Sequence, residues 1–320
     1  MKKLFFGLMF HHFHDGRKFF KTTGSIQKDD FYKIIKFFGK KNIISPAEFY
    51  TKYKKNKINK NEICLTFDDG LKSQFKIAFP IMQDLNIKGF FFIPSSIFEN
   101  KTNMLETVRY FKENFYKSIN DYYDDFYLEL KKITDFNIIK SKLKKNQIKF
   151  TFLKKKFNFY SIEDIKYRFV RDFLISKKNF EKANRALFKK KKFNYKKIHT
   201  NFFMTKKDIK ILSNNYNDIG LHSHSHPTNI SNLSYNQQLS EYRKNKNILE
   251  KIINKKIKSM SHPCGKYNLD TLKILNLLKI KNAFLPDKNK KFSSNILNHS
   301  YLIPREDHAN LINKFKNNIN

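Results

Sequence analysis

Three histidines stand at alternate positions in the segment IGLHSHSHPTN, residues 219–229. They are His222, His224 and His226, in a chain that has ten histidines in 320 residues. Imidazole nitrogen is a common ligand of transition metals, and a catalytic metal site usually takes three protein ligands and keeps one position for water. The segment is therefore a candidate metal site. The alternative interpretation is a polar loop whose histidines are satisfied by their neighbours.

The choice of ligand pair depends on the local backbone. If the loop turns helically, His222 and His226 at i and i+4 face the same side, and His224 points away into a supporting role. If the segment stays extended, His222 and His224 share a face instead. The residues of the loop alone leave both pairs open.

Other polar residues follow strand-like runs elsewhere in the chain. Asp68 and Asp69 follow the run ICLTF, His11 and His12 follow the first run, and HPCG at residues 262–265 follows the fifth. In a parallel barrel or sheet the carboxyl ends of the strands share one rim, so residues far apart in sequence meet there. One aspartate could then complete a metal site, and the other would be free to act as a general base.

The elements that must position these residues follow an alternating pattern. Short strand-like runs are separated by helix-length amphipathic segments, which is typical of βα units around a parallel sheet. The predicted strands are residues 4–10, 63–67, 89–93, 218–221, 258–261 and 283–285. Ser234 and Gln237 have the spacing of a capping box and predict a helix that begins there, and Asn268 is predicted to cap another.

The middle of the chain has a different composition. Residues 103–201 carry Lys-, Phe- and Tyr-rich helical patterns without glycine, strand alternation or a cluster of candidate ligands. They are predicted to form a helical insertion or lid that shapes substrate access and contributes no metal ligand. Residues 1–102 and 202–320 are predicted to form one α/β domain.

The net charge of +37 at pH 7 comes mainly from lysines that are spread through the chain. We interpret this charge as a solvated surface and expect no specific nucleic-acid partner. Attraction to acidic glycans or phospholipid head groups stays open.

Compartment signals point to the cytoplasm. Cys64 and Cys264 offer neither a disulfide framework nor a CxxC metal motif, which fits a reducing compartment. The first apolar run is short and interrupted by Gly7, so it is interpreted as a strand rather than a signal peptide. No apolar stretch approaches the length that would span a bilayer.

Three motifs, in this order, resemble those of the polysaccharide deacetylase family, the NodB-homology domains of carbohydrate esterase family 4. They are LTFDDG at residues 65–70, HSHSHP at 222–227 and SHPCGKYN at 261–268. The resemblance covers residues 1 to about 100 and about 200 to 310. It implies a distorted (β/α) barrel and a hydrolase that uses a metal to remove an N- or O-acyl group, usually acetyl, from a sugar.

The resemblance also implies a division of roles. The family spacing H-[ST]-x-x-H matches His222 and His226, and Asp69 matches the metal carboxylate, so these three are expected to hold a divalent ion, with Zn²⁺ as the expected metal. Asp68 matches the catalytic base. The oxyanion is expected to accept a hydrogen bond from the main-chain N–H of Cys264, which replaces an aromatic residue of the family.

Two further roles of the family, the arginine beside the catalytic aspartate and the general acid, are harder to match in this chain. Ser261 stands where many members have an arginine that restrains the catalytic aspartate, and Arg305 in IPRED is predicted as its substitute. The general acid is normally a late histidine. His308, after the strand-like run SYLIP, is predicted for that role, with His299 as the alternative.

The substrate implied by the resemblance is an acetylated amino-sugar glycan or a lipid-linked saccharide, handled in lipopolysaccharide or capsule biosynthesis. His11 resembles the MYH opening of members that act in surface-polysaccharide assembly, and it is predicted to bind substrate with His262 and Tyr267. A cytoplasmic location, with peripheral association with the inner membrane as a further option, fits this substrate.

Two other functions compete with deacetylation. The first is a deformylase or other deacylase that acts on a lipid-linked amino sugar. The second is a non-catalytic glycan-binding or nucleic-acid-binding protein on the same scaffold. The presence of Asp68, Asp69, His222 and His226 together argues against the second, because binding alone would not need them.

Overall fold

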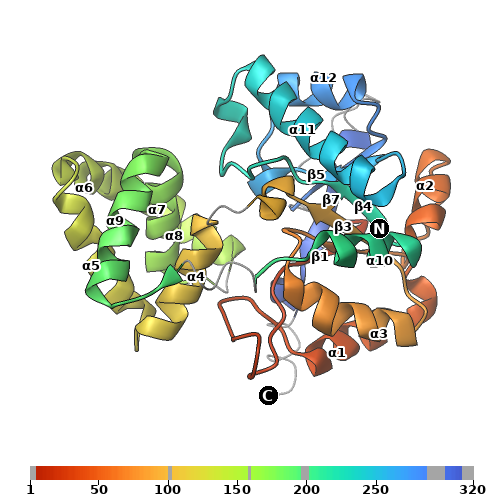
Figure 1. Cartoon of the computed structure of the whole chain (residues 1–320), viewed down its shortest axis with the longest axis horizontal. Helices are drawn as coiled ribbons and strands as arrows, with labels where there is room; N and C mark the ends of the chain where they lie inside the picture. Colours follow the sequence, from red (N-terminus) through yellow and green to blue (C-terminus); the bar gives the residue numbers. More distant parts are fainter. Residues whose placement is uncertain (1–4, 100–102, 158–159, 196–201, 287–299, 312–320) are drawn as a thin grey trace. The chain divides into compact units, whose positions relative to one another are not determined.

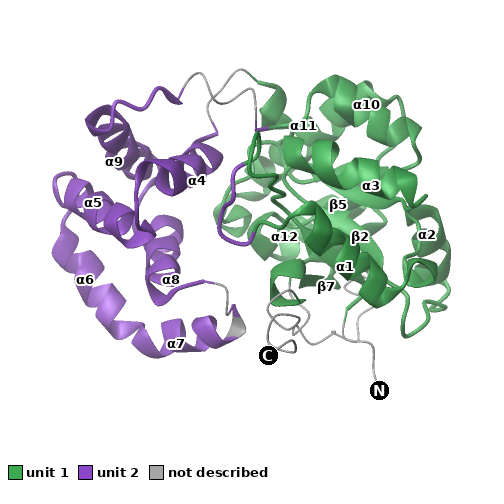
Figure 2. Ribbon diagram, turned by 90° about the horizontal axis from the view of Figure 1, so that it is seen from below, with its two compact units in different colours: residues 1–19, 25–101, 203–320 green, residues 20–24, 102–202 purple. Residues whose placement is uncertain are grey.

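The structure is a computed structural model that describes residues 5–99, 103–157, 160–195, 202–286 and 300–311. The chain forms two compact units (Figure 2). Unit 1 comprises Met1–Phe19, Ser25–Lys101 and Phe203–Asn320, and unit 2 comprises Phe20–Gly24 and Thr102–Phe202.

Unit 1 is a parallel β-barrel surrounded by helices (Figure 1). The strands pair in chain order, and β1 also pairs with β7, which closes the barrel. The strands are β1 (Gly7–Phe10), β2 (Cys64–Phe67), β3 (Gly89–Ile93), β4 (Asp218–Leu221), β5 (Ser259–Ser261), β6 (Asn282–Leu285) and β7 (Ile303–Asp307). The helices are α1 (Lys28–Phe38), α2 (Pro46–Lys54), α3 (Phe79–Asp84), α10 (Lys206–Asn214), α11 (Tyr235–Ile253) and α12 (Leu269–Leu277). The predicted (β/α) barrel is thereby confirmed.

The two helix starts predicted from capping residues are also confirmed. The Ser234 hydroxyl accepts a hydrogen bond from the main-chain N–H of Gln237 at the start of α11, and the Gln237 side chain accepts one from the N–H of Ser234. Asn268 caps α12 in the same reciprocal way with Thr271.

The last strand differs from its prediction. The run SYLIP was expected to be the strand, whereas β7 comprises the residues IPRED. A run of three charged residues, Arg305 to Asp307, is not typical of a buried strand. They are tolerated here because the strand leads to the polar rim of the barrel, where Arg305 has a charged partner.

Aromatic side chains fill the amino-terminal end of the barrel. Phe90, Phe92 and Phe284 form one buried cluster with Phe49 of α2, and neighbouring ring centroids lie 5.2 to 6.1 Å apart. Gly220 of β4 makes room for this packing, since a Cβ there would lie 2.5 Å from the Phe92 ring. The filled interior leaves the carboxyl ends of the strands as the place for polar chemistry.

Unit 2 is helical in all its regular described elements. These are α4 (Met104–Phe115), α5 (Ile119–Lys131), α6 (Phe136–Lys145), α7 (Gln147–Lys156), α8 (Ile162–Phe169), the π-helical turn η4 (Val170–Leu174) and α9 (Lys177–Lys190). The unit has its own apolar core, in which Phe111, Tyr122, Phe126 and Phe188 are at most 1% exposed. None of the helices described in either unit is long and apolar enough to cross a bilayer.

Candidate metal centre

Asp69, His222 and His226 bring three ligand atoms together at the carboxyl end of the barrel. Asp69 Oδ1 lies 3.3 Å from Nε2 of His222 and 3.3 Å from Nε2 of His226, and the two Nε2 atoms are 3.2 Å apart. Ligand atoms about 2.0–2.1 Å from a tetrahedral ion lie about 3.3–3.4 Å from one another. The donor set therefore fits a divalent ion such as Zn²⁺.

Hydrogen bonds of the ring nitrogens outside the cluster explain which histidines face it. Nδ1 of His222 lies 2.8 Å from the main-chain oxygen of Ser261, so it carries the proton and leaves the Nε2 lone pair for a metal. His224 is turned away, with Nδ1 2.8 Å from Ser95 Oγ and Nε2 3.1 Å from Glu99 Oε1. The structure thus brings the i,i+4 pair together, and not the i,i+2 pair.

The protonation states of two of the three residues suit a metal ligand. Burial would raise the pKa of Asp69, but its hydrogen bond with His222 and the nearby imidazoles outweigh burial and hold the pKa well below its usual value. Burial lowers the pKa of His226, which favours the neutral imidazole. Burial would also lower the pKa of His222, but Asp69 and Asp68 outweigh burial and raise it. Of the two histidines, His222 is therefore the one for which protons compete more strongly with a metal.

The backbone of the ligand loops adopts a conformation that non-glycine residues rarely take. Asp69 has φ 77°, Ser223 has φ 57° and His226 has φ 51°. Such left-handed residues cost free energy and are common where a site must be held in a fixed geometry. Ser223 is fully buried, and its hydroxyl accepts a hydrogen bond of 3.1 Å from the N–H of His226, which holds the turn between the ligands.

Helix α11 holds the same loop from outside. Oε2 of Glu241 accepts hydrogen bonds from the main-chain N–H groups of His224 (2.9 Å) and Ser225 (2.7 Å), and Oε1 accepts one from the Ser225 hydroxyl (2.8 Å). One turn later, buried Asn245 accepts from the N–H of His222 and donates to a main-chain oxygen of β3. Neither residue was predicted from the sequence, although a polar Asn245 within the apolar stripe of the helix was a usable signal.

Replacing Glu241 with alanine is expected to weaken divalent metal binding about 10- to 100-fold, the range typical of lost supporting hydrogen bonds around a metal site. The loop would lose three hydrogen bonds while every metal ligand stays in the chain. Competition with a chromophoric chelator measures the affinity. Glu241→Gln is the matched control, because its amide oxygen can still accept from both N–H groups. An alanine variant with wild-type affinity would show that α11 does not position the ligands.

Asp68 is held by a buried arginine. Nη1 and Nη2 of Arg305 donate to Oδ1 and Oδ2 of Asp68 at 2.8 Å each, and the Ser261 hydroxyl donates to Oδ2 at 3.0 Å. Asp68 and Arg305 are 3% and 1% exposed. Burial would raise the pKa of Asp68, but the Arg305 charge and hydrogen bonds outweigh it and lower the pKa to about 2. Asp68 is therefore an oriented carboxylate at neutral pH.

His308 lies on the other side of the barrel wall from Asp68. Its ring stacks on Phe10 at 5.1 Å, and its Nδ1 lies 2.9 Å from a main-chain oxygen of β1. Phe10 packs on Phe31 of α1, so this ring pair belongs to the layer between strands and helices. Side chains alternate along a strand, and Arg305 takes the inward side. The expectation that His308 stands beside Asp68 as general acid therefore does not fit this placement.

The remaining predicted residues divide between the site and its support. His262 is 1% exposed, with Nε2 2.8 Å from the main-chain oxygen of Tyr301, and the ring of partly exposed Tyr267 packs on it at 5.0 Å. This burial leaves His262 little accessible surface for the predicted contact with substrate. Exposed Cys264 has φ 51° in the turn after β5. His299 lies outside the described residues.

His11 lies at the same rim as Asp68. It follows β1, its side chain is partly exposed, and its main-chain oxygen accepts a hydrogen bond of 3.0 Å from Gln74. The same Gln74 amide also donates to the main-chain oxygen of Asp68 at 2.6 Å, and the preceding residues Phe10 and Phe67 pair between β1 and β2. The structure thus places His11 and Asp68 at the same level of the barrel rim.

Comparison with known proteins identifies the family that the chain resembles. The sequence profile of the polysaccharide deacetylase family matches residues 173–283, which include His222 and His226 but not Asp68 and Asp69. No curated protein sequence matches the chain. The profile match confirms the predicted resemblance, and the enzyme class that goes with it is that of hydrolases acting on amide bonds of acetylated sugars.

Solved deacetylase structures have a similar fold. The chain is 14% identical to the Streptococcus pyogenes deacetylase PplD in complex with acetate, with a TM-score of 0.55 and 98% of each chain covered. It is 11% identical to a de-N-acetylase from Aggregatibacter actinomycetemcomitans, with a TM-score of 0.55 and 98% of each chain covered. For IcaB from Ammonifex degensii the identity is 12% and the TM-score 0.53, with 94% of this chain and 90% of that chain covered. At these identities the likeness shows a shared fold.

Proposed function

We propose that this polysaccharide deacetylase-like chain is a metal-dependent hydrolase that removes an acetyl group from an amino sugar of a polysaccharide or surface glycan. The observation that carries the proposal is the pairing of two different aspartates at one strand end. Asp69 joins two imidazoles in a donor set that fits a divalent ion, and Asp68, its neighbour in the chain, is kept apart from that set by Arg305.

Asp68 is assigned the role of general base. Arg305 and Ser261 fix its carboxylate in one orientation, and the Arg305 charge keeps it ionised. A carboxylate with so low a pKa is a weak base, and a bound divalent ion, which we assign as Zn²⁺, supplies the Lewis acidity that makes water easier to deprotonate and polarises the acyl carbonyl. Asp68 then takes the proton as the water attacks.

Two further groups complete the proposed mechanism. His11 is assigned the delivery of a proton to the leaving amine, since its side chain is partly exposed and it stands beside Asp68 at the rim. This assignment replaces His308, which packs against Phe10. The main-chain N–H of Cys264 is assigned to the oxyanion, and Tyr267 to the sugar. A main-chain donor does not depend on the side chain that the residue carries.

The chain has only two cysteines, Cys64 and Cys264, which offer no disulfide framework; this fits a reducing compartment, and we therefore place the reaction in the cytoplasm. An acetylated precursor of a surface polysaccharide, free or lipid-linked, is the substrate that suits this location.

A deacetylase assay on acetylated amino-sugar oligomers tests the proposal. Protein loaded with one equivalent of Zn²⁺ should release acetate, and a chelator should stop release until metal is restored. N-formyl oligomers run in parallel decide between deacetylase and deformylase. Metal-loaded protein that hydrolyses neither acyl group would contradict a catalytic role. Oligonucleotide binding that falls steeply with added salt would favour the non-catalytic alternative.

A further inference from the structure

Helix α7 exposes two large apolar side chains on one face. Ile148 is 89% exposed and Phe152 is 64% exposed, and their i,i+4 spacing puts them side by side. Phe150 faces the opposite way and is buried, with its ring 5.3 Å from Phe169. Phe150 therefore anchors the helix to its unit, and the neighbouring apolar pair is left in water. Paired exposed apolar side chains on a lysine-rich helix suggest a binding surface.

All the charged residues in the sequence around this pair are lysines. Residues 136–162 contain eight lysines and no aspartate or glutamate. Lys142, Lys145 and Lys155 are all exposed, and Lys155 lies one turn beyond Phe152 on the same face of α7. Figure 2 shows α6 and α7 following one another along an edge of unit 2.

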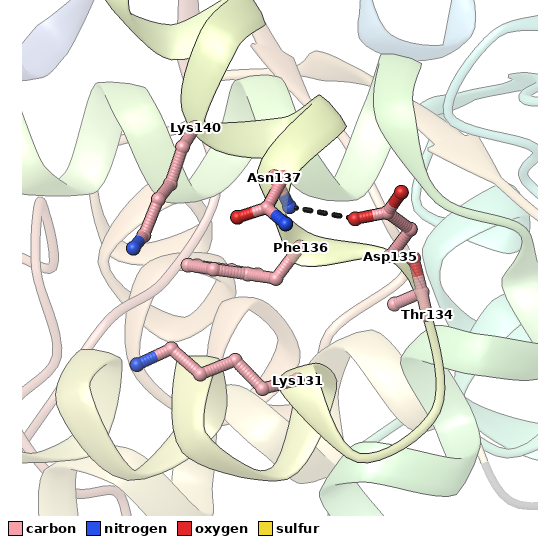
Figure 3. Close-up of a pocket in the computed structure, with 6 residues that line it drawn as sticks. All are labelled: Lys131, Thr134, Asp135, Phe136, Asn137 and Lys140. Carbon is pink, nitrogen blue, oxygen red and sulfur yellow. Dashed lines mark hydrogen bonds between the residues drawn. The ribbon is translucent and has the colours of Figure 1, made fainter.

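The start of α6 also combines an aromatic ring with lysine side chains. A hollow of about 430 Å³ is lined by Lys131, Thr134, Asp135, Phe136, Asn137 and Lys140 (Figure 3). The ammonium groups of Lys131 and Lys140 lie 5.3 and 5.9 Å from the centre of the Phe136 ring. The carboxylate of Asp135 accepts a hydrogen bond of 2.9 Å from the N–H of Asn137, so it is engaged in capping α6.

We propose that the α6–α7 surface, defined as residues Phe136 to Lys155, binds an anionic phospholipid bilayer. Ile148 and Phe152 insert at the boundary between head groups and acyl chains, and the lysines lie among the phosphates. Binding of a protein to such a bilayer grows with the apolar area that it buries there and with the content of anionic lipid. The inference rests on unit 2 alone and does not depend on the proposed activity.

Charge and side-chain type favour a bilayer over other occupants. A second copy of the chain would bring the same seven lysines of this surface against it, and like charges repel. Nucleic acid would satisfy the lysines but has no use for Ile148, which cannot stack on a base. An anionic bilayer satisfies both features, because its phosphates and its acyl chains lie within a few ångströms of each other.

Cosedimentation of the full-length chain with vesicles tests the proposal. Binding to phosphatidylcholine vesicles that contain phosphatidylglycerol is expected, and vesicles without it should bind far less. Ile148→Ser with Phe152→Ser should weaken binding roughly 10- to 100-fold. Replacing Lys142, Lys145 and Lys155 with Gln should weaken it roughly 100-fold, at about fivefold per lysine.

Leu269→Ser with Leu277→Ser is the matched control, because these leucines of α12 in unit 1 are 74% and 53% exposed. This control should bind vesicles like the wild type, and circular dichroism should show that all variants are folded. Equal binding by the Ile148/Phe152 variant and the wild type would overturn the proposal. So would loss of vesicle binding on addition of duplex DNA, which would assign the surface to nucleic acid, or loss of a dimer in the same variant.

Discussion

Replacing His226 with alanine is expected to abolish stoichiometric binding of a divalent metal to the purified protein. Asp69 and His222 would remain, but two ligands hold an ion far more weakly than three, and the affinity should fall by roughly 10²–10⁴-fold. Nε2 of His226 is 3.3 Å from Asp69 and 3.2 Å from His222, so its loss removes one corner of the donor set. Metal analysis after gel filtration at a limiting concentration of Zn²⁺ measures the effect.

His224→Ala is the matched control for this experiment. It removes the same side chain from the same loop, but the Nε2 of His224 pairs with Glu99 instead of the donor set. This variant should keep one equivalent of metal. His226→Asn belongs in the series as well, because asparagine tolerates φ 51° better than alanine and separates loss of the ligand from strain in the loop. Metal retained in both His226 variants, and lost in the His224 variant, would assign the site to the i,i+2 pair.

The place of the candidate metal centre could be predicted because its aspartates and its histidine loop follow recognisable strands, whereas the choice of ligands came from the family resemblance. The run before Asp68 and Asp69 and the run before His222 are short, apolar and followed by a break, and both form strands, β2 and β4. Parallel strands bring such ends to one rim whatever the length of the chain between them. The middle of the chain was recognisable as helical for the opposite reason, since it lacks both strand alternation and glycine.

What the sequence could not provide was the direction of individual side chains near the end of the chain. The register of β7 decides that Arg305 points inward to Asp68, 237 residues away in sequence, and that His308 points outward to Phe10. A shift of one residue would exchange these sides. The predicted run SYLIP did not include Arg305, so the two residues could not be assigned to opposite faces of the sheet.

The supporting residues were hidden for a related reason. Glu241 and Asn245 act through main-chain N–H groups of a loop 16 to 23 residues earlier in the chain. A hydrogen bond to a main-chain group does not require a particular partner side chain, so no pairing pattern appears in the sequence. Only the packing of α11 against the carboxyl end of β4 reveals it.

Asp68→Asn is expected to lower turnover of an acetylated amino-sugar oligomer by roughly 10²–10⁴-fold, the usual cost of losing a general base, with metal still bound. The substitution also disrupts the ion pair between Asp68 and Arg305. An amide cannot accept from both Nη1 and Nη2 of Arg305, which then stays buried with an uncompensated charge. Breaking a buried pair in this way costs about 3–5 kcal/mol of unfolding free energy. Activity alone would therefore not separate catalysis from folding.

The double variant Asp68→Asn with Arg305→Met separates the two effects. Removing both charges takes away the uncompensated cation, so chemical denaturation should show most of the lost stability restored. Turnover should stay as low as in the single variant, because the proton acceptor is still missing. Metal content should remain near one equivalent in both, since Asp69, His222 and His226 are untouched. Recovery of turnover in the double variant would show that Asp68 is not the base, and loss of metal from the folded double variant would show that the two aspartates share the ion.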